Sequence, residues 1–154
     1  WEKSRFLAPY LRNTLWESGI ALDTLETALP WAQVRAASGA IPQAIVEAMS
    51  KHNEQVLAFA HLSHVYRDGA SIYTTYLFRR TAEPDELLRR WHEMKHQASL
   101  TLQKYGGTIS HQHGVGTDHA LYLPAEKGAL GMDALHAVCK SFDPDGMMNP
   151  GKLF

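Results

Sequence analysis

The chain has 154 residues, of which 45% are hydrophobic and 20% charged, so it fits one globular domain and is not a disordered protein. Lysine and arginine total 15 against 16 aspartates and glutamates, and this net charge of -1 gives no overall field that favours nucleic acid or an anionic membrane. No apolar run approaches the roughly 20 residues of a membrane helix, and a single cysteine excludes an internal disulfide. We expect a cytoplasmic protein that binds any anionic ligand through a local cluster.

The first half of the chain predicts a helix, a strand and a longer helix. Residues 5–17 place apolar side chains on one side at helical spacing, and Gly19 provides a stop. Residues 20–27 alternate with the two-residue period of a strand. A helix then begins at Pro30 and runs to about residue 51, and we expect Gly39 and Pro42 to kink it or divide it into two.

The second half predicts a hairpin and two helices. Residues 55–66 and 71–78 are rich in Val, Ile, Tyr, Phe and Thr, and the turn signal between them predicts antiparallel pairing. Pro84 begins a helix with one apolar face, and a last helix covers about residues 130–142. This order predicts an α+β domain, partly ferredoxin-like, in which helices cover one face of an antiparallel sheet. Because the sequence begins at Trp1, we expect a piece of a longer polypeptide.

One short segment, Ser110-His111-Gln112-His113-Gly114-Val115-Gly116, has the densest set of hydrogen-bonding side chains. Two imidazoles flank an amide, and the glycines allow the backbone to approach a ligand closely. The same composition also fits a polar surface loop. Its Gly-x-Gly lacks a third glycine and a suitable strand-helix unit, which argues against a Rossmann dinucleotide site.

Several histidines could converge on a metal ion. They are His61, His64, His111, His113 and His119. No carboxylate is evident near them in the sequence, and the amide of Gln112 is a poor metal ligand. We therefore expect no metal site.

Tyr73 and Arg12 are further candidates for chemistry. Tyr73 lies in the second strand of the predicted hairpin, where its phenol could act as a general acid or base or could serve cross-strand packing. Arg12 projects from the first helix among apolar residues, so its guanidinium either extends to solvent or grips a carboxylate or phosphate.

Five sequence blocks, in order along nearly the entire chain, carry a family resemblance. They are Arg5-Phe6 with Ala8-Pro9-Tyr10-Leu11-Arg12, Asp23-Thr24-Leu25-Glu26-Thr27-Ala28, Asp68-Gly69-Ala70-Ser71-Ile72-Tyr73, residues 106–116 and residues 143–153. Together they resemble the C-terminal region of FAD-linked oxidases of the vanillyl-alcohol-oxidase type, and within these the alkyldihydroxyacetonephosphate synthase family. The resemblance implies that residues 1–154 are a substrate-binding cap domain that is inactive without an upstream FAD-binding domain.

The resemblance also implies roles for individual residues. In the synthase family an acid-base tyrosine matches Tyr73, a His-His-His run matches His111, Gln112 and His113, and an arginine that grips the substrate phosphate matches Arg12. The catalytic candidates are therefore Tyr73 and the two histidines, and the substrate-binding candidates are Arg12 and Gln112. Within the final Asn-Pro-Gly-Lys segment, the resemblance implies that Asn149 faces the flavin of FAD.

The chain departs from the family pattern at two places. Gln112 replaces the middle histidine and removes a titratable group, which weighs against ether-forming transfer and favours simple substrate oxidation. The lactate and glycolate dehydrogenase branch carries a Gly-Asp-Gly-Asn-x-His segment and a Gly-Glu-His-Gly segment that help hold a metal. Here Ala70-Ser71-Ile72-Tyr73 and Gln112-His113-Gly114 stand instead, which argues against a metal-dependent hydroxy-acid dehydrogenase.

The sequence therefore predicts the substrate-binding part of an FAD-dependent oxidoreductase or an alkyldihydroxyacetonephosphate synthase-like enzyme, with a role in lipid metabolism. Its expected partners are an upstream FAD-binding domain, a small anionic substrate and a second copy in a homodimer, without nucleic acid. The alternative hypothesis is a stand-alone α+β module that binds a small ligand or associates with itself.

Overall fold

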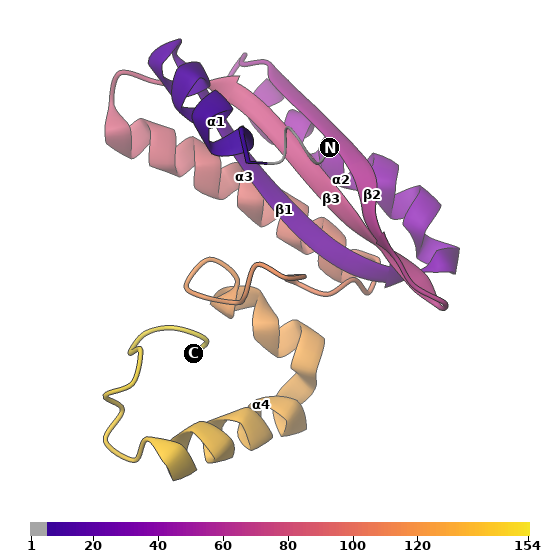
Figure 1. The fold of residues 1–154 in the computed structure, drawn as a ribbon, viewed down its shortest axis with the longest axis vertical. Coiled ribbons are helices and arrows are strands. Elements are labelled where there is room, and N and C mark those ends of the chain that lie inside the picture. The colour runs from indigo at the N-terminus through magenta and orange to yellow at the C-terminus, as the bar shows by residue number, and fades with distance from the viewer. Residues whose placement is uncertain (1–5) are drawn as a thin grey trace.

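The computed structural model describes residues 6–154, which form a three-stranded antiparallel sheet with helices packed on it (Figure 1). The elements are α1 (Ala8–Glu17), β1 (Ile20–Pro30), α2 (Trp31–Ser50), β2 (Val56–Val65), β3 (Gly69–Arg79), α3 (Pro84–Lys104), the 3-10 helix η1 (Ala120–Tyr122) and α4 (Leu123–Phe142). The expected α+β fold is confirmed. Within residues 6–154, none of the helices combines the length and the apolar composition of a membrane-spanning segment.

The sheet has the strand order β1-β3-β2, and β3 pairs antiparallel with both neighbours. The predicted hairpin of β2 and β3 is confirmed, and the register places Tyr73 opposite both Glu26 and His61. A β-bulge interrupts the pairing between Leu62 and Val65. Gly69 is required where β3 begins, because a Cβ atom there would lie 2.0 Å from the carbonyl oxygen of Leu29.

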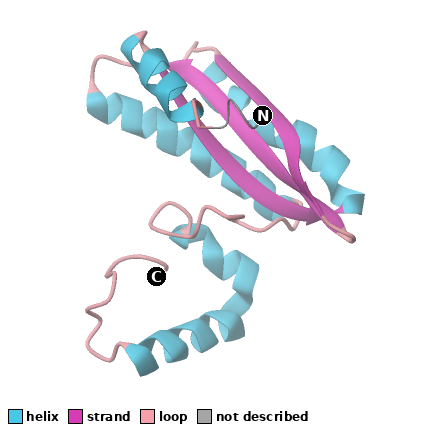
Figure 2. Cartoon of the chain, in the orientation of Figure 1, coloured by secondary structure: helices cyan, strands magenta, loops and turns pink. Residues whose placement is uncertain are grey.

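The core lies between the sheet and the helices α2 and α3, which pack side by side on one face (Figure 2). Alternate strand residues point to this face, because successive side chains of a strand alternate between its two sides. The largest fully buried side chains include Ile72 and Tyr76 of β3, Ile41 and Ile45 of α2, and Met94 of α3. The helix α1 lies against β1 and lines hollows over the opposite face.

The predicted division of the second helix is wrong, because α2 is one helix through Gly39 and Pro42. Ile41 and Ile45 near the proline are fully buried, and their packing outweighs the lost backbone hydrogen bond. The predicted last helix over about residues 130–142 is confirmed as the part of α4 that follows Gly128, whose φ of 68° interrupts the helix, but the part that begins at Leu123 was not predicted. Arg5, which was predicted to belong to the first helix, lies outside the described residues.

The C-terminal segment extends away from the sheet (Figure 1). Its helix α4 is exposed along most of its length, and Leu130 and Phe142 are 84% and 86% exposed. The tail bends back, so that the backbone nitrogen of Leu153 donates to the carbonyl oxygen of Gly116 at 3.2 Å. The loop after α3 contacts the sheet, since the backbone nitrogens of Thr108 and His111 donate to carbonyl oxygens of β1.

Candidate active site

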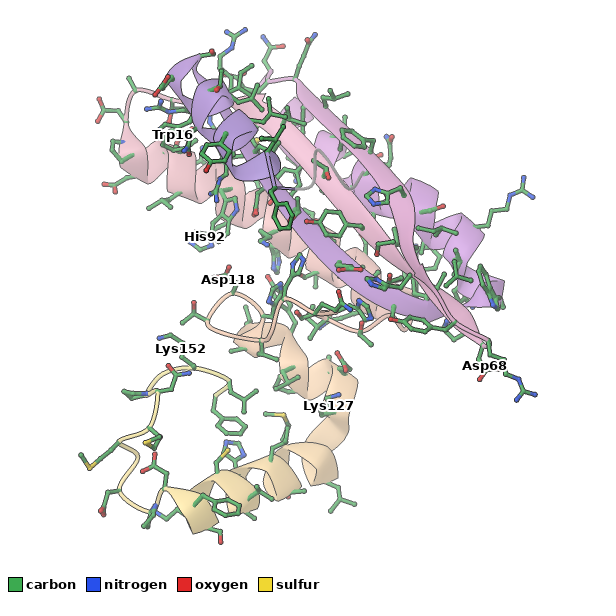
Figure 3. All side chains as sticks on the ribbon, in the orientation of Figure 1. Trp16, Asp68, His92, Asp118, Lys127 and Lys152 are labelled. Atoms are coloured by element: carbon green, nitrogen blue, oxygen red, sulfur yellow. The ribbon has the colours of Figure 1, made fainter. Side chains whose placement is uncertain are left out.

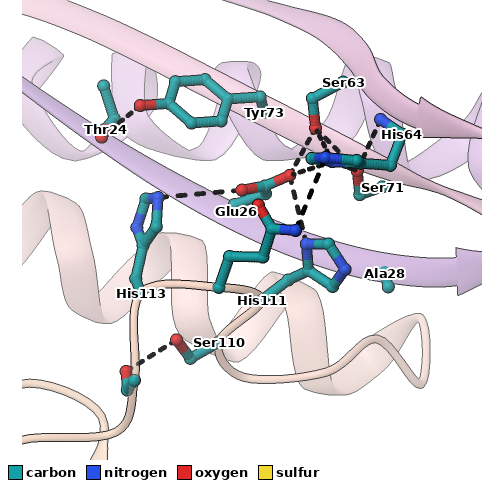
Figure 4. A network of polar contacts seen from close by, with 12 residues as sticks. Thr24, Glu26, Ala28, Ser63, His64, Ser71, Tyr73, Ser110, His111 and His113 are labelled. Atoms are coloured by element: carbon teal, nitrogen blue, oxygen red, sulfur yellow. Dashed lines mark hydrogen bonds and ion pairs between the residues drawn. The ribbon is translucent and has the colours of Figure 1, made fainter.

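The face of the sheet opposite α2 and α3 carries a cluster of polar side chains (Figure 4). Thr24 and Glu26 come from β1, Ser71 and Tyr73 from β3, and Ser63 from β2. Leu25, Ala70 and Ile72, which neighbour Glu26, Ser71 and Tyr73 in sequence, point into the apolar core on the opposite side, in agreement with strand alternation. We call the side of the sheet that carries the polar cluster the open face.

Glu26 is the centre of the cluster, and only 3% of its side chain is exposed. The hydroxyl of Ser63 donates a hydrogen bond to its Oε1. The Nδ1 atoms of His64 and His111 lie 3.4 and 3.2 Å from the same oxygen. The Nε2 atom of His113 lies 3.7 Å from Oε2. One buried carboxylate therefore faces three imidazoles.

The surroundings of Glu26 favour its ionised form. Burial by itself raises the pKa of this carboxyl, but hydrogen bonds from Ser63, Ser71 and His111 together lower the pKa below its ordinary value. The two serines are themselves joined, since their hydroxyl oxygens lie 2.6 Å apart. Glu26 is thus a negative charge held inside the wall of the open face.

The loop after α3 brings the other imidazoles to this carboxylate. The backbone nitrogen of Thr108 donates to the carbonyl of Ala28, and that of His111 donates to the carbonyl of Glu26, at 3.2 and 3.0 Å. The loop therefore lies along the free edge of β1. Gln112 then turns the chain with a φ of 62°, a conformation that is uncommon for a residue other than glycine. Such conformations cluster at functional sites.

Tyr73 lies beside this group of imidazoles. Its ring meets the ring of His113 edge to face, with centroids 5.7 Å apart, and its hydroxyl donates to Oγ1 of Thr24 at 3.2 Å. His111 contacts the phenol of Tyr66 instead, whose hydroxyl oxygen lies 2.9 Å from Nε2 of the histidine. The structure thus brings the three candidate catalytic side chains to one wall.

The remaining candidates are divided between two places. Arg12 is exposed and lines a hollow of about 490 Å³ that Tyr73 also lines. The amide nitrogen of Gln112 lies 3.5 Å from Nε2 of His64, so Gln112 belongs to the cluster. Asn149 does not, since it lines a separate hollow of about 560 Å³ between α4 and the tail.

Sequence reasoning missed the carboxylate. The statement that no carboxylate lies near the histidines is wrong, because strand pairing brings Glu26 to them. Its signal was a pair of polar residues, Thr24 and Glu26, at alternate positions of a strand and therefore on one of its two sides. Of the other histidines considered for a metal, His61 lies beside Tyr73 with ring centroids 5.4 Å apart, whereas His119 is buried and bonds to the carbonyl of Val115.

A second polar network lies between β1 and the buried helices. The carboxylate of Asp23 accepts hydrogen bonds from Nε1 of Trp91 at 2.6 Å and from the hydroxyl of Tyr76 at 2.9 Å. The Nζ atom of Lys95 lies 3.3 Å from Oδ2 of the same carboxylate. Burial alone raises the pKa of Asp23, but Lys95 and the hydrogen bonds lower it overall. Because Tyr76 is buried beside this charge, the pKa of its phenol is well above the ordinary value. This network joins strand to helix and serves structure.

The chain is similar to known proteins along its whole length. A family model described as the C-terminal domain of FAD linked oxidases matches residues 1–153. The alkyldihydroxyacetonephosphate synthases of Trypanosoma brucei brucei and Dictyostelium discoideum are 27% and 26% identical over 153 residues, which are 99% of this chain and 25% of each synthase. A D-2-hydroxyglutarate dehydrogenase of Stutzerimonas stutzeri is 32% identical over 100 residues, 65% of this chain and 20% of that protein.

The fold also matches a solved structure. An alkyldihydroxyacetonephosphate synthase superimposes with a TM-score of 0.68 and 21% sequence identity, over 97% of this chain and 24% of that one. The chain therefore spans about a quarter of the length of the synthases that it matches.

Proposed function

Because this chain belongs to the family of C-terminal domains of FAD-linked oxidases, we propose that it forms the substrate-facing wall of a flavin-dependent oxidoreductase or synthase-like enzyme. The FAD would be held by an upstream domain of the same polypeptide. The observation that carries this proposal is the open face, where Tyr73 and His113 lie together in front of the buried carboxylate of Glu26. The cytoplasmic location, the role in lipid metabolism and the homodimer remain predictions.

The described residues fit a wall that faces FAD rather than a pocket that encloses it. The ring of His113 keeps 29% of its side-chain surface exposed, Gln112 is exposed, and Tyr73 is partly exposed on the same side. When bound, FAD supplies the redox chemistry that accepts two electrons from a substrate. The residues of this chain would position the substrate and exclude water. Asn149 would approach the flavin from the C-terminal segment, apart from this wall.

Oxidation of a substrate alcohol releases one proton besides the hydride equivalent. The residues of the wall would take up this proton. This proton would pass to the hydroxyl oxygen of Tyr73 as that hydroxyl gives its own proton to the neutral imidazole of His113, so that one proton leaves the substrate and one arrives at the imidazole. Glu26 lies behind His113 and stabilises the positive charge that the imidazole gains. His111 would hold its position in the same wall through Tyr66.

Arg12 would bind the anionic part of the substrate. It makes no ion pair with another residue in the described range 6–154, and the hollow that it lines reaches Tyr73. A guanidinium in this position can form paired hydrogen bonds with a carboxylate or phosphate. Gln112 would contribute a neutral amide to the substrate, and its lack of a titratable proton favours oxidation over ether-forming transfer.

Single-turnover reduction of the flavin in the complete gene product tests the proposal. Small anionic hydroxy compounds, both hydroxy acids and phosphorylated alcohols, are screened for bleaching of the flavin absorbance. With the substrate found, Tyr73→Phe should slow flavin reduction by at least about 100-fold, the usual contribution of an acid-base residue, and should leave the FAD content unchanged. Tyr105→Phe, at the end of α3, is the matched control and should behave as wild type.

Two results would contradict the proposal. The first is a complete gene product that carries no FAD. The second is a Tyr73→Phe protein that is reduced as fast as the control.

A further inference from the structure

Arg12 lies on α1, a helix that packs little against the rest of the described chain. The helix lies against β1, but the side chains of Tyr10 and Leu11 are 68% and 57% exposed. A helix of ten residues is marginal in water by itself, because most helical stability in proteins comes from the packing of an apolar face. The position of α1 therefore depends on contacts other than burial.

Arg80, the residue after β3, makes three contacts with the end of this helix. Its Nη1 donates to the carbonyl oxygen of Trp16 at 2.6 Å, and its Cζ lies 4.0 Å from the centroid of the Trp16 ring. Its backbone nitrogen donates to the carbonyl oxygen of Gly19 at 2.8 Å. Trp16 lies in the last turn of α1 (Figure 3). We propose that Arg80 is a positioning residue that fixes α1 and thereby places Arg12 beside Tyr73, an inference that rests on the proposed substrate binding by Arg12.

The charge of Arg80 suits the end of a helix. The last carbonyl groups of a helix lack partners within it and carry partial negative charge, so a cation beside them is stabilising. α1 has no basic side chain in its own last turn. The carbonyl oxygen of Trp16 has two lone pairs and accepts from the backbone nitrogen of Gly19 at 3.1 Å as well as from Arg80. Arg80 is therefore the cation that completes this helix end.

The flat guanidinium also holds the tryptophan ring. A cation within about 6 Å of the centroid of an indole is attracted to the face of the ring, and a planar guanidinium stacks on that face while its nitrogens stay free to donate. Arg80 makes both contacts with one residue, since the ring and the carbonyl oxygen belong to Trp16. Together they restrict the position of the last turn of α1 and its rotation about the helix axis.

The position of Arg12 follows that of Trp16, because residues four apart are neighbours on one face of a helix. Their Cα atoms lie about 6 Å apart along the helix axis. Both side chains line a hollow of about 370 Å³ whose walls include residues of β1 and α3, and Arg12 also lines the hollow of about 490 Å³ that reaches Tyr73. A shift of the last turn of α1 would therefore move the guanidinium of Arg12 relative to Tyr73.

Arg80 acts through the helix rather than on the substrate. It lines a different hollow, of about 1000 Å³, at the end of the sheet where β2 begins and β3 ends, whereas Tyr73 lines the hollow of Arg12. Its guanidinium is held on Trp16. Loss of Arg80 should therefore weaken substrate binding without removing a group that touches the substrate.

Hydrogen exchange of the complete gene product, measured by mass spectrometry on peptides that cover residues 6–19, tests whether Arg80 fixes α1. Bonds such as that from the nitrogen of Ser18 to the carbonyl of Thr14, at 3.1 Å, protect these amides. Arg80→Ala should increase their exchange rate by about 10-fold or more, the effect of losing one charged hydrogen bond. Arg80→Lys keeps the charge but not the flat group, so its exchange rate should lie between those of Arg80→Ala and wild type. Arg79→Ala, at the exposed preceding residue, is the matched control and should exchange like wild type.

Steady-state kinetics with the hydroxy compound that bleaches the flavin tests the link to Arg12. Arg80→Ala should raise KM by about 10-fold and leave kcat nearly unchanged, because an anion-binding group acts on substrate and transition state alike. In an Arg12→Ala background the same substitution should change KM little, since two residues that act through one contact are not additive. Circular dichroism checks that each variant folds.

The proposal is wrong if peptides 6–19 of a folded Arg80→Ala protein exchange as slowly as those of the control. It is also wrong if exchange rises but KM does not, since Arg80 would then only stabilise α1, or if KM rises equally with and without Arg12. Hydrogen exchange requires neither FAD nor substrate, so the two proposals fail separately. Faster exchange in a protein without FAD would contradict the proposed function and support the fixing of α1 by Arg80.

Discussion

The two faces of the sheet differ in composition although the same strands form both. The face beneath α2 and α3 carries apolar side chains such as Leu25 and Ile72 that are almost fully buried. The open face carries Glu26, Ser71 and Tyr73, together with the exposed apolar side chain of Leu57. One face provides the burial that stabilises the fold, and the other holds groups that can react. Substitutions on the two faces should therefore change different measurements.

The largest effect on stability is expected on the helix-covered face. Ile72→Ala removes a fully buried side chain at the centre of the core and should lower the free energy of unfolding by about 2–5 kcal/mol. Leu57→Ala on the open face, where the side chain is 63% exposed, should change it by less than about 0.5 kcal/mol. Urea unfolding measures both. Equal losses would show that the open face is also part of the core.

Asp23→Asn should have the next largest effect, because it leaves three donors without a charged acceptor. We expect a loss of about 2–3 kcal/mol at neutral pH. The pKa of Asp23 is lowered from 3.8 in the folded chain, so its stabilisation is complete above that value and is lost as the pH falls below it. Melting temperatures between pH 6 and pH 2 should converge for wild type and variant. If the melting temperatures of wild type and variant differ by the same amount at every pH, the ionised carboxylate of Asp23 is not the source of this stabilisation.

Glu26→Gln should be milder. Glutamine keeps the volume of the side chain and one acceptor oxygen. Its amide nitrogen, however, replaces the second carboxylate oxygen and removes the negative charge that Ser63 and His111 face in the wild type. The free energy of unfolding should fall by about 1–2 kcal/mol. The same denaturant series measures it, with Glu47→Gln on the exposed surface of α2 as control. A loss as large as that of Ile72→Ala would make Glu26 a mainly structural residue.

Tyr73→Phe should have the smallest effect on stability. The hydroxyl makes one long hydrogen bond to Thr24, at 3.2 Å, and the ring stays in place, so the change should stay below about 1 kcal/mol. The variant should nevertheless lose flavin reduction in the complete protein, as proposed above. Its melting temperature and its reduction rate, measured on one preparation, distinguish the two faces most directly. A large loss of both would remove the distinction.

The elements that sequence reasoning predicted well depend on local patterns. The hairpin of β2 and β3 follows from two β-rich runs around a turn, and α3 follows from an apolar face repeated at helical spacing. The predicted division of α2 at Pro42 was wrong, because the free energy lost locally at the proline is smaller than the free energy gained by burying Ile41 and Ile45. The early start of α4 was missed because Gly128 breaks the pattern there.

The candidate site was predicted only in part. The histidine loop, Tyr73 and Arg12 were visible as unusual residues and as parts of a family resemblance. Glu26 was visible only as a polar residue in a strand, and its contact with His111 spans the chain from β1 to the loop after α3. Such a contact leaves no local periodicity, so sequence spacing could not reveal it.

The sequence by itself determined the class of fold, the family resemblance and most of the residues that can react, since short-range hydrogen bonding and side-chain alternation depend on neighbouring residues. The tertiary structure alone decided that a carboxylate from β1 and imidazoles from β2 and the loop after α3 come together. Strand pairing over long separations produces that meeting, and the free energy that drives it comes from the apolar core on the other face of the same sheet.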